Sequence, residues 1–118
     1  MRDIRFRAWD KVSKTMYTDA INNCVDSFDL VLKHPQIYEV MEFTGLKDKN
    51  GVEIYEGDII QELKINWEVV FYKGAWRLRT NVDGDMQYKS LNRYANRCEV
   101  IGNIYENPEI LKKLKEGE

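Results

Sequence analysis

Histidine and cysteine are the side chains most often used for nucleophilic and metal chemistry, and this chain of 118 residues has very few of them. It contains one histidine, His34, and two cysteines, Cys24 and Cys98. A catalytic triad needs a base, usually histidine, beside a Ser, Cys or Thr nucleophile. The spacing leaves open a dyad of His34 with either cysteine, but no other residue pattern supports one. Structural zinc sites use about four Cys, His or acidic ligands in spaced pairs, so the sequence predicts no metal site.

Calcium and phosphate motifs are missing as well. Gly84 fits the sixth position of a calcium-binding loop best, but this alignment puts Arg79 at the first ligand position and Ser90 at the twelfth, where acidic ligands are required. The sequence contains neither GxxxxGK[ST] nor GxGxxG, the two loops that bind phosphates. Pairs of carboxylates are uninformative in a chain with 20 acidic residues. We therefore predict no catalytic residue, no cofactor and no enzymatic activity.

Cations and aromatic residues occur together at two places, a combination that is typical of single-strand nucleic-acid binding. Side chains of a strand alternate between its two faces, so Arg5, Arg7 and Trp9 are expected on one face. The same alternation predicts that Arg77 and Arg79 face solvent. The candidate nucleic-acid contacts are Arg5, Arg7, Trp9, Arg77 and Arg79. The net charge of −2 disfavours tight DNA binding.

The charges are unevenly distributed along the chain. Acidic residues are concentrated in residues 18–63, while basic residues dominate residues 1–17 and 71–97. This asymmetry is typical of a partner-binding surface or of charge pairing inside the protein. Neighbouring strands of a sheet often pair opposite charges, which favours internal pairing.

Short runs of β-branched and aromatic residues predict a mainly β fold. We expect strands at residues 4–9, 15–17, 37–43 and 99–105, and a hairpin of residues 67–72 and 75–80 around Lys73-Gly74. Asn50-Gly51 predicts a tight turn of type I′, because both residues tolerate positive φ, and it follows a surface turn that begins at Thr44. Residues 19–34 fit a short helix or loop followed by a strand at 28–32. Ser90 to Tyr94 fits one helical turn.

The end of the chain carries the clearest helix pattern, which predicts a helix over residues 108–116. Asn107 can cap this helix, Pro108 suits its first position, and Glu109 complements the positive end of its dipole. An apolar stripe follows, which could dock on the remainder of the chain or on a second copy. The candidate self-association residues are Ile110, Leu111 and Leu114.

Three stretches of the sequence carry a further signal: residues 4–10 (IRFRAWD), 43–60 (FTGLKDKNGVEIYEGDII) and 99–109 (EVIGNIYENPE). Taken together, they resemble the YopX family of phage and prophage proteins. The resemblance implies a small SH3-like β-barrel with an N-terminal β-hairpin, encoded by a phage or prophage of a Gram-positive bacterium, and it implies no activity. Residues 18–36 depart from the family pattern. We expect a single domain over residues 1–118, with its barrel core at about 37–106.

Small barrels need sharp turns between short strands. Asn50 and Gly57-Asp58, in the longest of the three stretches, are therefore interpreted as turn formers rather than as ligands. The N-terminus has no apolar segment typical of a signal peptide, and no apolar run approaches the roughly 18 residues of a membrane helix. We expect a cytoplasmic protein.

Two functions follow as hypotheses. The first is a non-enzymatic phage accessory protein that acts through protein–protein contacts or self-assembly, for which the helix stripe is the candidate surface. The alternative is a small barrel that binds single-stranded nucleic acid through the arginines named above. A third hypothesis, a toxin-type ribonuclease, depends only on the similarity of Gly57-Asp58-Ile59-Ile60 to the opening of such barrels.

Overall fold

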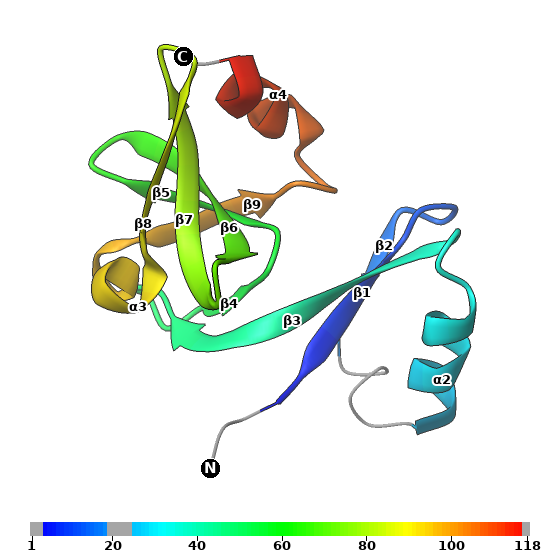
Figure 1. Ribbon diagram of the computed structural model, residues 1–118. Helices are drawn as coiled ribbons and strands as arrows, with labels where there is room; N and C mark the ends of the chain where they lie inside the picture. The colour runs from blue at the N-terminus through cyan, green and yellow to red at the C-terminus, as the bar shows by residue number, and fades with distance from the viewer. Residues whose placement is uncertain (1–3, 19–24, 117–118) are drawn as a thin grey trace.

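The computed structural model describes residues 4–18 and 25–116 of the chain. Two antiparallel sheets make up most of these residues (Figure 1). The N-terminal sheet has the strand order β2-β1-β3-β4. Its strands are β1 (Phe6–Asp10), β2 (Thr15–Tyr17), β3 (Tyr38–Lys47) and β4 (Glu53–Tyr55).

The second sheet has the order β8-β7-β6-β5-β9 and curls into a half-barrel. Its strands are β5 (Asp58–Glu62), β6 (Ile65–Tyr72), β7 (Ala75–Val82), β8 (Asp85–Ser90) and β9 (Glu99–Asn103). Helix α2 (Val25–Lys33) lies on the N-terminal sheet, on the side away from the half-barrel (Figure 1). Helix α3 (Leu91–Tyr94) and the 3-10 helix η1 (Ala95–Arg97) follow β8, and α4 (Pro108–Glu116) packs against β7 and β6.

Burial of apolar side chains divides between two clusters of unequal size. The larger cluster lies inside the half-barrel, and the smaller one joins Ala8 of β1 to Val31 of α2. Such burial stabilises a fold by about 25 cal/mol per Å² of apolar surface, so the half-barrel contributes most. The larger cluster consists of Ile54, Ile60, Trp67, Val69, Leu78, Leu91, Ala95 and Cys98.

Strand β3 pairs with two strands of the N-terminal sheet, its first half with β1 and its second half with β4. The register with β4 shifts between Phe43 and Lys47, and Gly45 within this shift has a φ of 86°. Thr44 secures the irregular backbone, because its hydroxyl donates to the carbonyl of Ile54 (2.7 Å) and accepts from the N–H of Leu46 (3.2 Å). The bulge thus turns β3 from the N-terminal sheet towards the half-barrel.

Three two-residue turns connect β5, β6, β7 and β8. All six of their residues have positive φ, as type I′ turns demand. Two turns end in glycine, Lys73-Gly74 and Asp83-Gly84, but the first turn is Leu63-Lys64, with φ of 52° and 66°. Side chains disfavour this left-handed region by roughly 1–2 kcal/mol per residue, so the first turn is strained.

Replacing Leu63 by asparagine and Lys64 by glycine is therefore expected to stabilise the protein. Leu63 is 85% exposed, so little packing is lost, and Asn-Gly adopts the type I′ turn readily. The extra freedom of glycine in the unfolded chain offsets part of the gain. We expect the free energy of unfolding to rise by about 1 kcal/mol, measured by urea denaturation. An unchanged or lower value would show that this turn is not strained.

The mainly β fold, the N-terminal hairpin, the hairpin at Lys73-Gly74 and the C-terminal helix are confirmed. Several local predictions are wrong. Residues 28–32 are helical within α2, β3 continues through Thr44 to Lys47, and β8 was not anticipated. At Asn50-Gly51 only Gly51 has positive φ, so this turn is not of type I′. Ser90 does cap α3, because its hydroxyl accepts from the N–H of Arg93.

Candidate functional site

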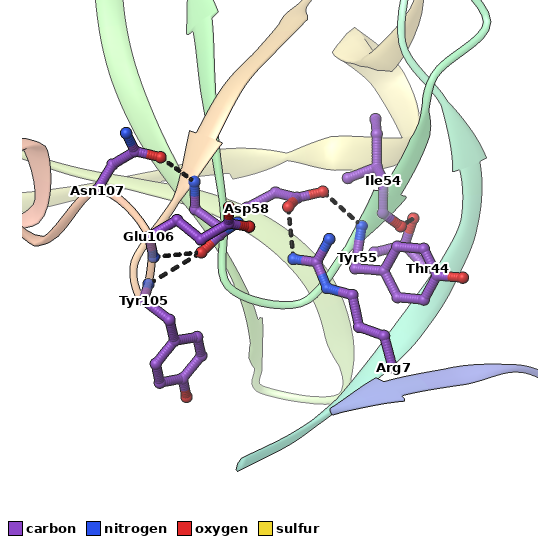
Figure 2. A network of polar contacts seen from close by, with 9 residues as sticks. Arg7, Thr44, Ile54, Tyr55, Asp58, Tyr105, Glu106 and Asn107 are labelled. Atoms are coloured by element: carbon purple, nitrogen blue, oxygen red, sulfur yellow. Dashed lines mark hydrogen bonds and ion pairs between the residues drawn. The ribbon is translucent and has the colours of Figure 1, made fainter. Parts of the chain in front are cut away.

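The first predicted contact residues, Arg5, Arg7 and Trp9, do share one face of β1, but this face packs against the half-barrel. Arg7 donates to the carboxylate of Asp58 at 2.6 Å, and its guanidinium lies 4.6 Å from the ring centroid of Tyr55. Its side chain is only 11% exposed and that of Asp58 only 2%. Figure 2 shows Arg7 reaching from β1 to this carboxylate. The ion pair therefore links the two sheets.

The neighbours of Arg7 on this face also have partners within the chain. Arg5 forms a bidentate ion pair with Glu53, and its guanidinium lies 4.4 Å from the ring centroid of Phe43. Trp9 is buried and stacks on Tyr105, with ring centroids 6.2 Å apart. The three β1 residues thus contact their own chain, and the opposite face of β1 is covered by α2 through Ala8.

Asp58 is the carboxylate on which an acid–base role would depend. Burial raises its pKa, and Arg7 and the backbone N–H of Tyr55, which donates at 2.8 Å, act against this effect. Both oxygens of the carboxylate have partners within the chain. A group that is this buried and already bonded suits structural support rather than proton transfer to a substrate, as the interpretation of Gly57-Asp58 as turn formers expected.

Asp48 holds the turn between β3 and β4. One of its oxygens accepts the N–H groups of Asn50 (2.8 Å) and Val52 (2.9 Å), and the other accepts the N–H of Val100 in β9 (2.9 Å). Burial acts to raise the pKa of Asp48, but the three backbone donors outweigh burial and the pKa is lowered. Asp48 thus joins the turn between β3 and β4 to the last strand, β9.

A second polar clamp joins β9 to α4. The side-chain oxygen of Asn103 accepts the N–H groups of Tyr105 and Glu106, and that of Asn107 accepts the N–H of Asn103 at 3.1 Å. A Cβ on Gly102 would lie 2.7 Å from Cγ of Asn107, which explains the glycine. The side-chain oxygen of Asn107, which was predicted to cap the helix, therefore bonds to the strand. Figure 2 shows these contacts beside those of Asp58.

The thiol of Cys98 is unsuited to nucleophilic catalysis. It is fully buried and lies 3.1 Å from the carbonyl of Tyr94, to which it donates. Burial, followed by the charge of Glu62, raises its pKa to about 11. The main chain of His34 closes the turn between α2 and β3, while Cys24 lies outside the described residues. No group of His, Cys, Asp or Glu within residues 4–18 and 25–116 could hold a metal ion.

The side chain of Lys89 points into the half-barrel and is only 20% exposed. Its Nζ forms an ion pair with Glu62 and lies 4.4 Å from the ring centroids of both Trp67 and Tyr94. Glu62 is buried, and the Lys89 side chain is largely covered. This arrangement fixes the last part of β8 against the core.

The second pair of predicted arginines lies on the outer face of β7. Arg79 forms a 2.8 Å ion pair with Glu68 of β6, and Nε of Arg77 donates to the carbonyl of Tyr72 at 2.9 Å. Both side chains are half-buried rather than fully solvated. On this face the rings of Tyr72 and Tyr88 stack with centroids 4.4 Å apart.

The structure brings one residue of each predicted set together beside α4. Two hollows of about 140 and 380 Å³ flank Leu114 and share Thr80, and Arg79 lines the larger one. The apolar stripe of α4 is half-buried and packs on its own sheet. We call the two hollows the α4 groove, which is lined by Lys64, Ile65, Asn66, Glu68, Arg79, Thr80, Asn81, Met86, Tyr88 and Leu114.

Sequence reasoning missed the β8 part of this groove. Met86 is 45% exposed and Ile65 of β6 is 47% exposed. Each of the two hollows is therefore lined by an accessible apolar side chain. The alternation of Met86 and Tyr88 with Gln87 and Lys89 is a strand signal that could have revealed it.

Comparison with known proteins gives one family. The sequence profile described as YopX protein matches residues 5–112. The chain is similar to protein EF1440 from Enterococcus faecalis, with 26% identity, a TM-score of 0.50, and coverage of 94% of this chain and 99% of that one. It is similar in fold to YopX from Bacillus subtilis, with 17% identity, a TM-score of 0.50, and coverage of 92% and 98%. No curated protein sequence matches. No helix within the described residues has the length and hydrophobicity to cross a membrane.

Proposed function

Since this chain belongs to the YopX family, we propose that it is a phage- or prophage-encoded accessory protein without enzymatic activity, which acts in the host cytoplasm by binding another protein. The observation that carries this proposal is the α4 groove. Its larger hollow of about 380 Å³ has the size of a binding pocket. Methionine, tyrosine and arginine line it, and these residue types are enriched in protein–protein interfaces.

The chemistry of the polar residues supports a binding role over a catalytic one. Two acidic residues of the stretch 43–60 are held by contacts within the chain, since Asp48 accepts three backbone N–H groups and Asp58 pairs with Arg7. The burial and bonding of Asp58 at the start of β5 support this proposal over the ribonuclease hypothesis.

The positions of the arginines favour a protein partner over single-stranded nucleic acid. Phosphate binding requires cations that are accessible to a nucleic-acid strand. Arg7 is only 11% exposed and pairs with Asp58, Arg5 pairs with Glu53, and Arg79 pairs with Glu68. The rings of Tyr72 and Tyr88 stack on each other, so each offers at most one face to a base.

Affinity capture with a matched pair of variants tests this function. A tagged full-length chain is expressed in a bacterial host that carries the phage or prophage, and captured proteins are quantified by mass spectrometry. Ile65→Lys puts a charge in the α4 groove, and Val12→Lys makes the same kind of change at a 78% exposed residue in the turn between β1 and β2. We expect the wild type and Val12→Lys to retain a common partner and Ile65→Lys to retain at least tenfold less.

Two outcomes would contradict the proposal. Equal capture by all three proteins would show that the α4 groove does not bind the partner. Release of the captured proteins by nuclease digestion would favour the nucleic-acid alternative. Circular dichroism of the purified variants establishes that both are folded.

A further inference from the structure

Strand β8 is an open edge of the five-stranded sheet. Among residues 4–18 and 25–116, β7 is the only strand that pairs with it. The six residues Asp85–Ser90 pair with β7 without a register shift. The outer side of β8 therefore presents a straight row of backbone N–H and C=O groups, which is a template for another strand.

Proteins usually protect such edges with a proline, a bulge, a very short strand or a charge that points across the edge. Strand β8 has none of these devices except the charge of Asp85, which lies at its turn end. It has no proline and no bulge, and its one lysine, Lys89, is held in the core by Glu62, Trp67 and Tyr94. The half of the strand near the turn, Asp85–Gln87, is exposed.

The turn before β8 determines which backbone groups point outward. Val82 and Asp85 flank the two-residue turn Asp83-Gly84. In such a hairpin the flanking residues exchange hydrogen bonds, and bonded and non-bonded pairs then alternate. Asp85, Gln87 and Lys89 thus bond to β7. The N–H and C=O groups of Met86, Tyr88 and Ser90 point to the open edge.

The sequence of β8 is complementary to itself in one antiparallel register. With Gln87 opposite Gln87 of a second copy, Met86 lies opposite Tyr88, and both have outward backbone groups that can bond. Asp85 then lies opposite Lys89, whose ammonium is already paired with Glu62, so no like charges meet at the ends of the paired segment. A one-residue change of register would place inward backbone groups opposite outward ones.

From this complementarity we propose that β8 pairs antiparallel with β8 of a second copy of this chain, centred on Gln87, to form a two-fold symmetric dimer with a continuous sheet. This inference rests on the proposed function, since it names a second copy as one protein partner. A symmetric interface uses the same surface of both copies, as this register does. Few residues take part, so the dimer dissociates on dilution.

Neighbouring contacts prepare the edge for pairing. Tyr88 is already held by its stacking on Tyr72, and Lys89 by its ion pair with Glu62. Two strand residues thus lose little freedom on association. The thioether of Met86 from one copy would lie beside the ring of Tyr88 from the other, a favourable sulfur–aromatic contact.

Light scattering after size exclusion, together with amide hydrogen exchange, tests the dimer and its register. We expect the mass to rise with concentration from 14.0 kDa towards twice that value. The amides of Met86 and Tyr88 are expected to gain at least tenfold protection over the same range. The amides of Gln87 and Lys89 are protected at every concentration, because they bond to β7.

Two substitutions probe the interface while leaving the β7 pairing intact. Met86→Pro removes an N–H that only the second copy uses, and proline is tolerated at such edge positions. Asp85→Lys places like charges opposite each other. Both are expected to weaken the dimer at least tenfold, while Asp29→Lys on exposed α2 leaves it unchanged.

A mass of one chain at all concentrations would overturn the inference, and so would a dimer in which Met86 and Tyr88 remain unprotected. The proposed function fails separately. A monomer that still captures a partner through the α4 groove refutes the β8 dimer alone, whereas a β8 dimer whose groove captures nothing refutes the groove alone.

Discussion

Replacement of Asp48 by asparagine is expected to lower the free energy of unfolding by about 2–4 kcal/mol, measured by urea denaturation at neutral pH. Both carboxylate oxygens of Asp48 accept backbone N–H groups, one from Asn50 and Val52 and the other from Val100. An asparagine has only one acceptor oxygen, so its NH₂ group would face a backbone donor. Either the N–H groups of Asn50 and Val52 or the N–H of Val100 then lose their hydrogen-bond acceptor.

Asp10 provides the matched control, because it also closes a turn with backbone hydrogen bonds. A single oxygen of Asp10 accepts both the N–H of Val12 (2.9 Å) and that of Ser13 (3.0 Å). Asp10→Asn can keep both bonds but loses the charge that these donors favour, as the lowered pKa of Asp10 shows, so we expect a smaller loss of stability than for Asp48→Asn. Equal effects of the two substitutions would show that the second oxygen of Asp48 contributes nothing.

The contribution of Asp48 also depends on pH. The pKa of Asp48 in the folded protein lies below its usual 3.8, since the backbone donors outweigh burial. The unfolded chain therefore binds the proton more readily, so this contribution is complete above pH 3.8 and is lost as the pH falls through the folded pKa. We expect Asp48→Asn to lose this part of the acid sensitivity.

Removal of Arg7 is expected to have the largest effect, a loss of about 3–5 kcal/mol in the free energy of unfolding. Arg7→Ala leaves the carboxylate of Asp58 buried without its ion-pair partner. Such a loss is a large fraction of a typical stability of about 5–15 kcal/mol. Because burial already raises the pKa of Asp58, and Arg7 opposes this, the variant takes up a proton there more easily. The destabilisation should therefore shrink as the pH falls towards 3.8.

Arg5→Ala is the control on the same face of β1. Arg5 and Glu53 are each about one-third exposed, at 31% and 32%, and exposed pairs contribute roughly 1 kcal/mol or less. Urea denaturation of both variants compares the two losses directly. A loss for Arg7→Ala no greater than that for Arg5→Ala would mean that Asp58 finds solvent or another partner.

The sequence predicts those elements whose signals are local. Lys73-Gly74 between two β-rich runs gives the central hairpin, and Asn107-Pro108 gives the start of α4. The helix α2 and the strand β8 escape prediction for opposite reasons. The apolar run around Leu30 suits a helix and a strand equally. Strand β8 lacks an apolar inward face, because its inward residue Lys89 is a lysine that becomes compatible with the core only through its ion pair with Glu62.

Side-chain roles depend on the tertiary arrangement and are harder to predict. Alternation correctly puts Arg7 and Trp9 on one face, but it cannot reveal that a second layer covers this face. Strand β1 lies between α2 and the half-barrel, so Ala8 and Trp9 are both buried. The α4 groove unites Arg79 with Leu114 across 34 intervening positions, a proximity that no local pattern encodes.

Strand β3 pairs with both β1 and β4, and this double pairing restricts where residues can be inserted into the chain or deleted from it. One extra residue before the bulge at Gly45 would reverse the inside and outside of one half of the strand relative to the other. Either the β1 pairs or the Phe43–Tyr55 pair would then turn the wrong side chains inward. We therefore expect insertions and deletions to be excluded from this segment. We expect them to be tolerated at surface turns such as Lys11–Lys14, because a change of length there does not alter the register of β3 with β1 and β4.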